Sequence, residues 1–275
     1  MIKLALGIRV LVRESLVGAA GAPLWGPWLG HPVTLATLTF VDVRVDGPLD
    51  GATRWVLDVA APRAGGRDDT DLTDALRSAL DSHPDGAVEL WIQEVDDASD
   101  SVATRIGFQQ YRDLWQLRCT LPNTASGLTT RAFTLDDLDD FIGVNNRAFH
   151  WHPEQSGLTR EKVLATTEEP WFDADGFRLL HDHDGDGRLI GFCWTKIHGD
   201  EAPPLGEIYV IAIDPSAHGR GLGKPMTLAG LEWLTAAGLE HGMLYVESDN
   251  DPANATYAGI GFTRHHTNRA YRLDR

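Results

Sequence analysis

Apolar and polar positions in the second half of the chain follow a pattern that predicts a mixed α/β fold. Residues 135–149 (LDDLDDFIGVNNRAF) repeat apolar side chains at helical spacing. Strands are predicted where short apolar runs are bounded by turn residues, at 177–182, 188–198, 206–214, 243–249 and 264–274. Helical patterns separate the last three of these strands, so we expect one mixed sheet covered by helices.

A weak internal repeat relates the two halves of the chain. A shift of 154 residues places LYVESDN (244–250) on LWIQEVD (90–96), and IGF (260–262) on IGF (106–108). The same shift places YVIAI (209–213) on WVLDV (55–59). Three landmarks on one offset favour a duplicated domain, although short apolar strands can also match by chance.

The boundary between the two copies is expected in residues 121–130 (LPNTASGLTT). This segment is rich in Pro, Ser, Thr and Gly and has no apolar periodicity. We therefore predict two domains, 1–125 and 126–275, each of ordinary size.

The overall composition excludes several classes of protein. With a formal net charge of −16, the chain lacks the excess of basic residues that is typical of proteins that bind nucleic acid or anionic membranes. The two cysteines, Cys119 and Cys193, have no metal-ligand spacing and favour a reducing compartment. Arg9, Arg13 and Glu14 interrupt the first apolar run, which argues against a secretory signal peptide. No apolar run is long enough to be a transmembrane helix. We expect a cytoplasmic monomer with no nucleic-acid or membrane partner.

The segment DPSAHGRGLGKP (214–225), between a predicted strand and a predicted helix, has the composition of an anion site. Gly219, Gly221 and Gly223 let a ligand approach the main chain, whose N–H groups can point at an anion near the helix N-terminus. Donors or charges are added by His218, Arg220 and Lys224. The spacing is neither that of a P-loop nor that of a dinucleotide-binding turn. A glycine-rich connection without a ligand is the alternative.

The pattern from His218 to Gly223, H-x-x-G-x-G, resembles the R/Q-x-x-G-x-G/A signature of the GCN5-related N-acetyltransferase family. In that family the loop binds the pyrophosphate of acetyl-CoA. The family's ending N-x-x-A-x-x-x-Y-x-x-x-G-F is matched in register by Asn250, Ala253, Tyr257, Gly261 and Phe262. His218 departs from the usual Gln or Arg, but its ring can still donate a hydrogen bond.

Longer motifs are similar to the C-terminal half of the mycothiol synthase family, whose members are two-domain acetyltransferases. These motifs are NNRAFHWHPEQSG, WFDADG, GFCWTKIH, GEIYVIAIDP and LYVESDN. The resemblance implies two tandem N-acetyltransferase domains and acetyl-CoA as co-substrate. It also implies a small pseudodisaccharide acceptor, cysteinyl-glucosaminyl-inositol, whose cysteinyl amine would be acetylated to give mycothiol.

Two side chains suit amide formation, which needs a deprotonated amine and a protonated sulfur leaving group. Glu207 begins the strand that leads into the loop, where it can accept a proton directly or through water. Tyr257 is expected on a helix that faces the same cleft, where it can protonate the departing thiolate. The alternatives are a surface carboxylate for Glu207 and a core aromatic with a polar tip for Tyr257.

The resemblance further implies two sets of ligand-binding residues. Those for acetyl-CoA are Ile211, Ala212, Ile213, His218, Gly219, Arg220, Gly221, Leu222, Gly223, Lys224, Asn250, Asp251, Pro252, Ala253, Asn254 and Ala255. Those for the acceptor are Glu154, Lys196, Glu207 and Tyr245. Backbone N–H groups of 211–213 can receive a ligand only if the strand is locally splayed, which a bulge typically causes.

The first half lacks this chemistry. The 154-residue shift places Thr53 opposite Glu207 and Ala103 opposite Tyr257. It also places the acidic stretch GGRDDTD opposite the glycine loop, where carboxylates would repel a diphosphate. We therefore expect a degenerate N-terminal domain and a single catalytic domain.

Three other motifs of the sequence could in principle bind a metal ion. Residues 182–187 (DHDGDG) match half of an EF-hand loop, but a polar hairpin turn is the better interpretation. HWH (150–152) and HH (265–266) have no zinc-site spacing, so no metal is expected. The functional alternatives are acetylation of another amine, such as a peptide N-terminus or an aminosugar, and a non-catalytic acyl-CoA-binding module.

Overall fold

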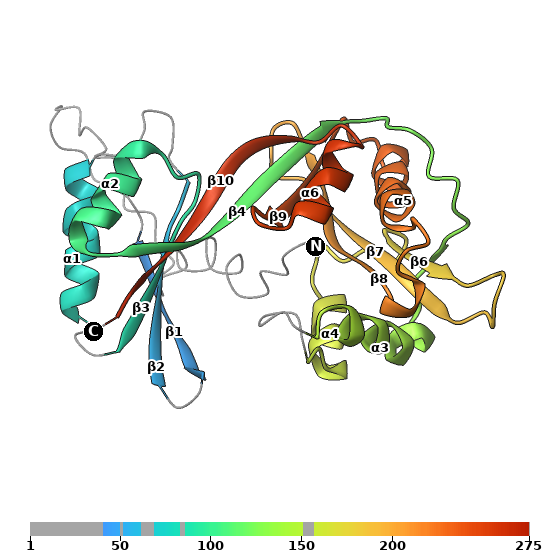
Figure 1. The fold of residues 1–275 in the computed structure, drawn as a ribbon, viewed down its shortest axis with the longest axis horizontal. Helices are drawn as coiled ribbons and strands as arrows, with labels where there is room; N and C mark the ends of the chain where they lie inside the picture. The colour runs from blue at the N-terminus through green and yellow to red at the C-terminus, as the bar shows by residue number, and fades with distance from the viewer. Residues whose placement is uncertain (1–40, 50–51, 62–68, 83–85, 151–156, 275) are drawn as a thin grey trace, which may run out of the picture. The chain divides into compact units, whose positions relative to one another are not determined.

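The computed structural model describes residues 41–49, 52–61, 69–82, 86–150 and 157–274 (Figure 1). These residues divide into two compact units. The larger unit is Asp113–Thr267, and the smaller unit contains the described residues before Asp113 and after Thr267.

The larger unit is a mixed sheet with strand order β4-β9-β8-β7-β6-β5. Its strands are β5 (Arg131–Ala132), β6 (Phe177–His181), β7 (Leu189–His198), β8 (Leu205–Ile213) and β9 (His241–Glu247), with the second part of β4 (Gln109–Thr120). Its helices are η2 (Leu135–Asp137), α3 (Leu138–Ala148), α4 (Arg160–Thr167), η3 (Pro215–Ala217), α5 (Gly223–Ala236) and α6 (Asp251–Ala258). The sequence pattern found all of these helices except η3 and α4. Only Val163 and Thr166 of α4 are buried, which leaves little apolar periodicity to detect.

The smaller unit has strand order β1-β2-β3-β10. Its elements are β1 (Val41–Leu49), β2 (Ala52–Val59), α1 (Asp69–Ser82), β3 (Ala87–Ile92), α2 (Asp97–Ile106) and the end of β10 (Thr263–Leu273). The strand β2 pairs with β3 in parallel, as β8 does with β9 in the larger unit.

The 154-residue offset of the sequence also relates the elements of the structure. The helices α1 and α5 begin 154 residues apart, and so do β3 and β9, α2 and α6, and β4 and β10. The order strand, helix, strand, helix, strand is the same in both copies. The described elements therefore recur at the offset seen in the sequence. That the two halves are copies of one domain stays a prediction.

The last strand of each copy pairs with the other copy's preceding strand. The strand β4, which follows β3 and α2, pairs with β9 from Leu114↔Glu247 to Thr120↔His241. The strand β10, which follows β9 and α6, pairs with β3. Both exchanged strands contain residues of both compact units, and residues 121–130 lie within the larger one. The assignment of domains to 1–125 and 126–275 stays a prediction.

The sheet of the larger unit is packed on both faces (Figure 1). One cluster joins α5 and α6 to Ile208, Ile211 and Leu244. The other joins α3 to an aromatic stack in which the Phe177 ring lies 4.6 Å from that of Phe133 and 4.5 Å from that of Trp194. A strand buried on both faces explains why 206–214 is a continuous apolar run rather than an alternating one.

Both cysteines are free and buried. Burial raises the pKa of the Cys119 thiol to about 11 and that of Cys193 even further. Protonated, inaccessible thiols act as small apolar side chains in the core. None of the described helices combines the length and the hydropathy that a membrane span requires.

Two glycines let α5 lie close to the sheet. A Cβ on Gly230 would overlap Cys193 Sγ and lie 2.7 Å from Ile208 Cδ1. A Cβ on Gly206 of β8 would lie 2.7 Å from Leu234 Cδ2 of α5. These contacts are shorter than carbon atoms tolerate, so the helix–sheet distance depends on the missing side chains.

Replacing Gly230 by alanine is expected to destabilise the protein by about 1–3 kcal/mol, because overpacking outweighs the better helix propensity of alanine. Urea unfolding measures this free energy. Gly199→Ala is the control, since a Cβ there meets nothing within 4 Å, and it should change stability by less than about 0.5 kcal/mol. Equal stability of the two variants would contradict the close packing of α5.

Candidate active site

The strands β8 and β9 form a parallel ladder over only two pairs, Gly206↔Gly242 and Glu207↔Met243. On its other edge β8 continues to pair with β7 as far as Ile213. Within the described residues, Ile211–Ile213 therefore belong to no ladder on the edge that faces β9. This is the splayed strand that the family resemblance implied for these residues.

A β-bulge lies next to the point where the strands part. Trp194 pairs with Val210 and Thr195 pairs with Ile208, so Tyr209 is an extra residue in β8. A bulge bends its strand and increases the local twist, which accounts for the departure of β8 from β9. The expected bulge is present, and it lies at Tyr209.

The opened edge leads into the glycine loop. Gly219 and Gly221 have φ of +79° and +72°, and a Cβ built on either meets nothing within 4 Å. The loop ends at α5, whose N-cap residue Leu222 makes no side-chain cap hydrogen bond. Left-handed glycines and an uncapped helix N-terminus present backbone N–H groups on an open surface, which is the arrangement that binds phosphates.

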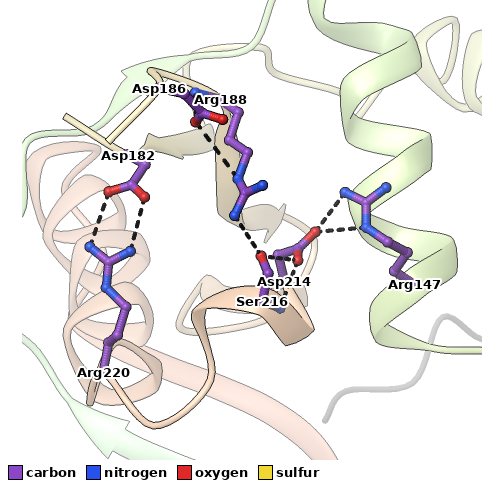
Figure 2. Close-up of polar contacts among 7 residues, drawn as sticks. All are labelled: Arg147, Asp182, Asp186, Arg188, Asp214, Ser216 and Arg220. Atoms are coloured by element: carbon purple, nitrogen blue, oxygen red, sulfur yellow. Dashed lines mark hydrogen bonds and ion pairs between the residues drawn. The ribbon is translucent and has the colours of Figure 1, made fainter. Parts of the chain in front are cut away.

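Ion pairs hold both sides of this loop (Figure 2). Asp214, at the end of β8, accepts hydrogen bonds from Arg147 of α3 at 2.6 and 2.9 Å and from the Ser216 backbone at 2.9 Å. Burial alone would raise the pKa of Asp214, but the hydrogen bonds from Ser216 and Arg147 hold it below its ordinary value. The buried carboxylate thus stays ionised and fixes the start of the loop.

The loop's own cationic or donor side chains are engaged with the protein. Arg220 forms two hydrogen bonds of 3.1 Å with Asp182, in the turn between β6 and β7 (Figure 2). His218 Nε2 donates to the Ile213 carbonyl at 3.0 Å, and Lys224 Nζ donates to the Gly259 carbonyl at 2.8 Å. The 182–187 segment is the polar hairpin turn that the sequence favoured, and its first carboxylate anchors the loop.

The second predicted cofactor segment, 250–255, forms the start of α6. Asn250 is the N-cap of that helix and accepts from the Ala253 backbone at 3.3 Å. Asn254 donates to the carbonyls of Glu247 and Ser248, whereas its Oδ1 is buried without a partner among the described residues. The bond from Lys224 to Gly259 ties this helix to the glycine loop.

Glu207 is 3% exposed and is the last residue of β8 that pairs with β9. Its Oε2 lies 2.6 Å from His198 Nε2 of β7. With the carboxylate ionised, the imidazole N–H donates this bond. The pair places a buried proton acceptor at the opening of the strands, and His198 is a residue that sequence reasoning did not find.

Tyr257 lies in the core on the α5–α6 side of the sheet. Desolvation, with a smaller contribution from Cys193, raises the pKa of its phenol far above the ordinary value. Ile208 belongs to the same cluster, so Glu207, its neighbour on the strand, points to the opposite face. The two predicted catalytic side chains therefore flank the sheet from different faces rather than lying side by side.

The predicted acceptor residues share the face of Glu207. Lys196 of β7 is directly opposite Glu207, and its Nζ lies 4.1 Å from the Trp171 ring and 5.5 Å from the Tyr209 ring. Tyr245 follows Met243, the partner of Glu207, by two residues and so points the same way. Glu154 lies outside the described residues. Within the described part of the chain, no group of three His, Cys, Asp or Glu is placed to hold a metal ion.

The tertiary contacts that sequence reasoning missed involve His198, Trp171 and the pair Arg147–Asp214. His198 and Trp171 lie inside motifs that carried the family resemblance, GFCWTKIH and WFDADG. Nothing in those motifs says which strand residues are paired, so only the register reveals their partners.

Comparison with known proteins identifies the family and the fold. Residues 144–262 match the model of the Acetyltransferase (GNAT) family. A "Mycothiol acetyltransferase" of Nocardia farcinica is 42% identical over 191 residues, covering 66% of this chain and 63% of that protein. One of Segniliparus rotundus is 41% identical over 206 residues, covering 71% and 77%. The chain thus spans less than two thirds of the first relative's length and more than two thirds of the second's.

A solved GCN5-related N-acetyltransferase from Sphaerobacter thermophilus has the same fold. It superposes with a TM-score of 0.62 at 18% identity, over 80% of this chain and 73% of that one. The splayed strands, the glycine loop and these similarities converge, and the chain belongs to the mycothiol acetyltransferase family and has the GNAT fold.

Proposed function

We propose that the protein is an acetyl-CoA-dependent N-acetyltransferase that acetylates the cysteinyl amine of cysteinyl-glucosaminyl-inositol to form mycothiol. The observation that supports this most is the opened edge of β8, which has buried Glu207 at its start and the glycine loop at its end. A general base at one end of the open strand edge suits an amine, and an anion-binding loop at the other end suits the pyrophosphate of an acyl-CoA.

The open strand edge and loop fit acetyl-CoA. The backbone of Ile211–Ile213 would hold the pantetheine arm, and the loop 218–224 would hold the pyrophosphate on N–H groups beside the α5 N-terminus. The segment 250–255 would line the other side of the arm. When bound, acetyl-CoA supplies the activated acetyl group.

Glu207 is the proposed general base. A buried carboxylate can take a proton from the acceptor's ammonium directly or through one water. His198 then remains hydrogen-bonded to Glu207 and keeps the carboxylate oriented. Burial of the pair excludes the bulk water that would compete for this proton.

Tyr257 is the proposed acid. A tyrosine phenol is protonated at neutral pH, and the raised pKa of Tyr257 keeps it so at alkaline pH as well. The Oη hydrogen is therefore present to be given to the leaving sulfur. Its position on the face opposite Glu207 separates the site of proton release from the site of proton uptake.

The acceptor would lie on the Glu207 face. The Lys196 ammonium supplies donors for a polyol, and the rings of Trp171 and Tyr209 hold it in place. Tyr245 and Glu154 are the other proposed contacts. A small polar acceptor such as the pseudodisaccharide suits this set, because its hydroxyl oxygens can accept from the ammonium.

We further infer that 1–125 form a degenerate N-acetyltransferase domain and that the protein works as a cytoplasmic monomer. The structural repeat supports a common origin of the two halves. The residues at the equivalent catalytic positions, Thr53 and Ala103, have no suitable proton-transfer chemistry. The free buried cysteines suit a reducing compartment.

Replacing Glu207 by glutamine should lower turnover by about 10²–10⁴-fold while acetyl-CoA still binds, because an amide cannot accept the proton. The deficit should shrink as pH rises, since more of the amine is then already free. Steady-state kinetics from pH 6 to about 10 cover the range of free amine. Glu201→Gln, at an exposed carboxylate, is the control and should retain turnover. Unchanged turnover in the Glu207 variant would remove it from the mechanism.

Calorimetry should find one strong acetyl-CoA site per chain, and Gly221→Asp should abolish it by charge repulsion and by blocking the loop. Gly127→Asp is a matched control, since its φ of +68° is close to that of Gly221 and its surroundings are equally open. Backbone strain is then equal in the two variants. Two equal sites, or weak binding in both variants, would contradict the assignment of the loop.

Lys196→Ala should weaken acceptor binding by about 1–3 kcal/mol through the loss of charge-assisted hydrogen bonds, with acetyl-CoA affinity intact. Kinetics with the pseudodisaccharide, beside a panel of peptide and aminosugar amines followed by mass spectrometry, measure this. Lys162→Ala, on the surface of α4, is the control. A wild-type protein that acetylates other amines and ignores the pseudodisaccharide would refute the proposed acceptor and leave only the reaction class.

A further inference from the structure

A buried amide lies next to the proposed acceptor residue Tyr245. Gln116 of β4 is 3% exposed and directly opposite Tyr245 of β9 in the antiparallel ladder. Its Nε2 lies 2.8 Å from Tyr245 Oη, and its Oε1 lies 2.7 Å from Arg118 Nε. Most buried side-chain amides are hydrogen-bonded at both ends, and Gln116 is as well.

The direction of these hydrogen bonds is fixed by Arg118. A guanidinium has donors and no acceptor, so the atom of Gln116 that faces Arg118 must be the oxygen. The NH₂ group of the same amide must then face Tyr245. Because that group donates, the phenol oxygen accepts, and its own hydrogen points away from Gln116.

All three side chains lie on the face of the sheet that carries Glu207. Leu117 and Cys119 belong to the cluster on the α5–α6 side, so Gln116 and Arg118, which alternate with them, point to the other face. Met243 of β9 pairs with Glu207 of β8 on one side and with Arg118 of β4 on the other. The polar side chains of β8 and β4 therefore flank it on this face.

The geometry points to Gln116 as a positioning residue that makes the Tyr245 hydroxyl an obligatory donor toward an acceptor oxygen. Arg118 sets the amide, the amide sets the phenol, and the phenol selects a hydroxyl or carbonyl oxygen of the acceptor. This inference rests on the proposed function and adds a specificity rule to it. An acceptor that offers only a donor at this point is discriminated against, because two hydrogens would face each other.

Gln116→Glu is the sharpest test, because glutamate has the same shape and keeps the Arg118 bond but accepts from Tyr245 instead of donating to it. The phenol hydrogen is then held inward. The acceptor KM should rise about 10-fold, the cost of one misdirected hydrogen bond, while the acetyl-CoA KM and kcat change less than about 2-fold. Gln116→Met, which imposes no direction, should fall between the wild type and the glutamate variant. Gln110→Glu, at an exposed position of β4, is the control for added charge.

The coupling between Gln116 and Tyr245 separates positioning from a general packing effect. In a Tyr245→Phe background the acceptor KM should already be raised, and Gln116→Glu should then add no further increase. Independent, multiplying effects of the two substitutions would show that Gln116 acts without Tyr245, and would overturn the proposal.

A readout without catalysis keeps this test distinct from that of the proposed function. Carbon-13 labelling of the five tyrosine rings, with Tyr245→Phe to assign the signal, gives the pKa of the Tyr245 phenol by NMR. The Gln116 donor stabilises the phenolate, so both Gln116 variants should titrate at higher pH than the wild type. An unmoved titration would overturn the hydrogen-bond direction whatever the enzyme acetylates. If the titration moves and the wild type acetylates a different amine, the KM comparison is made with that amine, and an unchanged KM there overturns the specificity rule.

Discussion

After the pair Glu207–Met243, the strands β8 and β9 form no further ladder pairs among the described residues, and the proposed acetyl-CoA site depends on this separation. A parallel ladder that continued to Ile213 would consume the backbone groups that a ligand needs. The bulge at Tyr209 bends β8 away, while β7 holds its other edge to the last residue. The strand is thereby open on one side and rigid on the other, which is what a precisely shaped binding edge requires.

The close packing of α5 keeps this opening in place. Gly230 and Gly206 remove the side chains that would push the helix from β7 and β8. The N-terminus of α5 is consequently fixed beside the end of β8, and the glycine loop has a short, defined path between them. Asp214 secures the start of that path through Arg147 and Ser216. The loop glycines can then be left-handed without making the whole loop loose.

Although the net charge of the chain is −16, cationic side chains near the site are held by carboxylates or by aromatic rings. Asp182 engages Arg220, and this hydrogen bond lowers the pKa of the carboxyl group. On the other face, Lys196 lies against aromatic rings, directly opposite Glu207. Each cation therefore has a defined position before any ligand arrives, which reduces the ordering cost of binding.

Local composition and spacing predicted the strand–loop–helix order, the glycine positions and the 154-residue offset. The family was predicted from the resemblance of longer motifs, and the relatives confirm it. The apolar run also placed Glu207 at the start of the strand, and the resemblance implied a bulge in it. The sequence did not reveal that His198 binds Glu207, that Tyr257 is buried on the opposite face, or that Gln116 contacts Tyr245. Those contacts join residues from different strands, and Gln116 reaches Tyr245 only because β4 pairs with β9. Register and face are set by tertiary packing, since a shift of one residue would turn every one of these side chains to the other face.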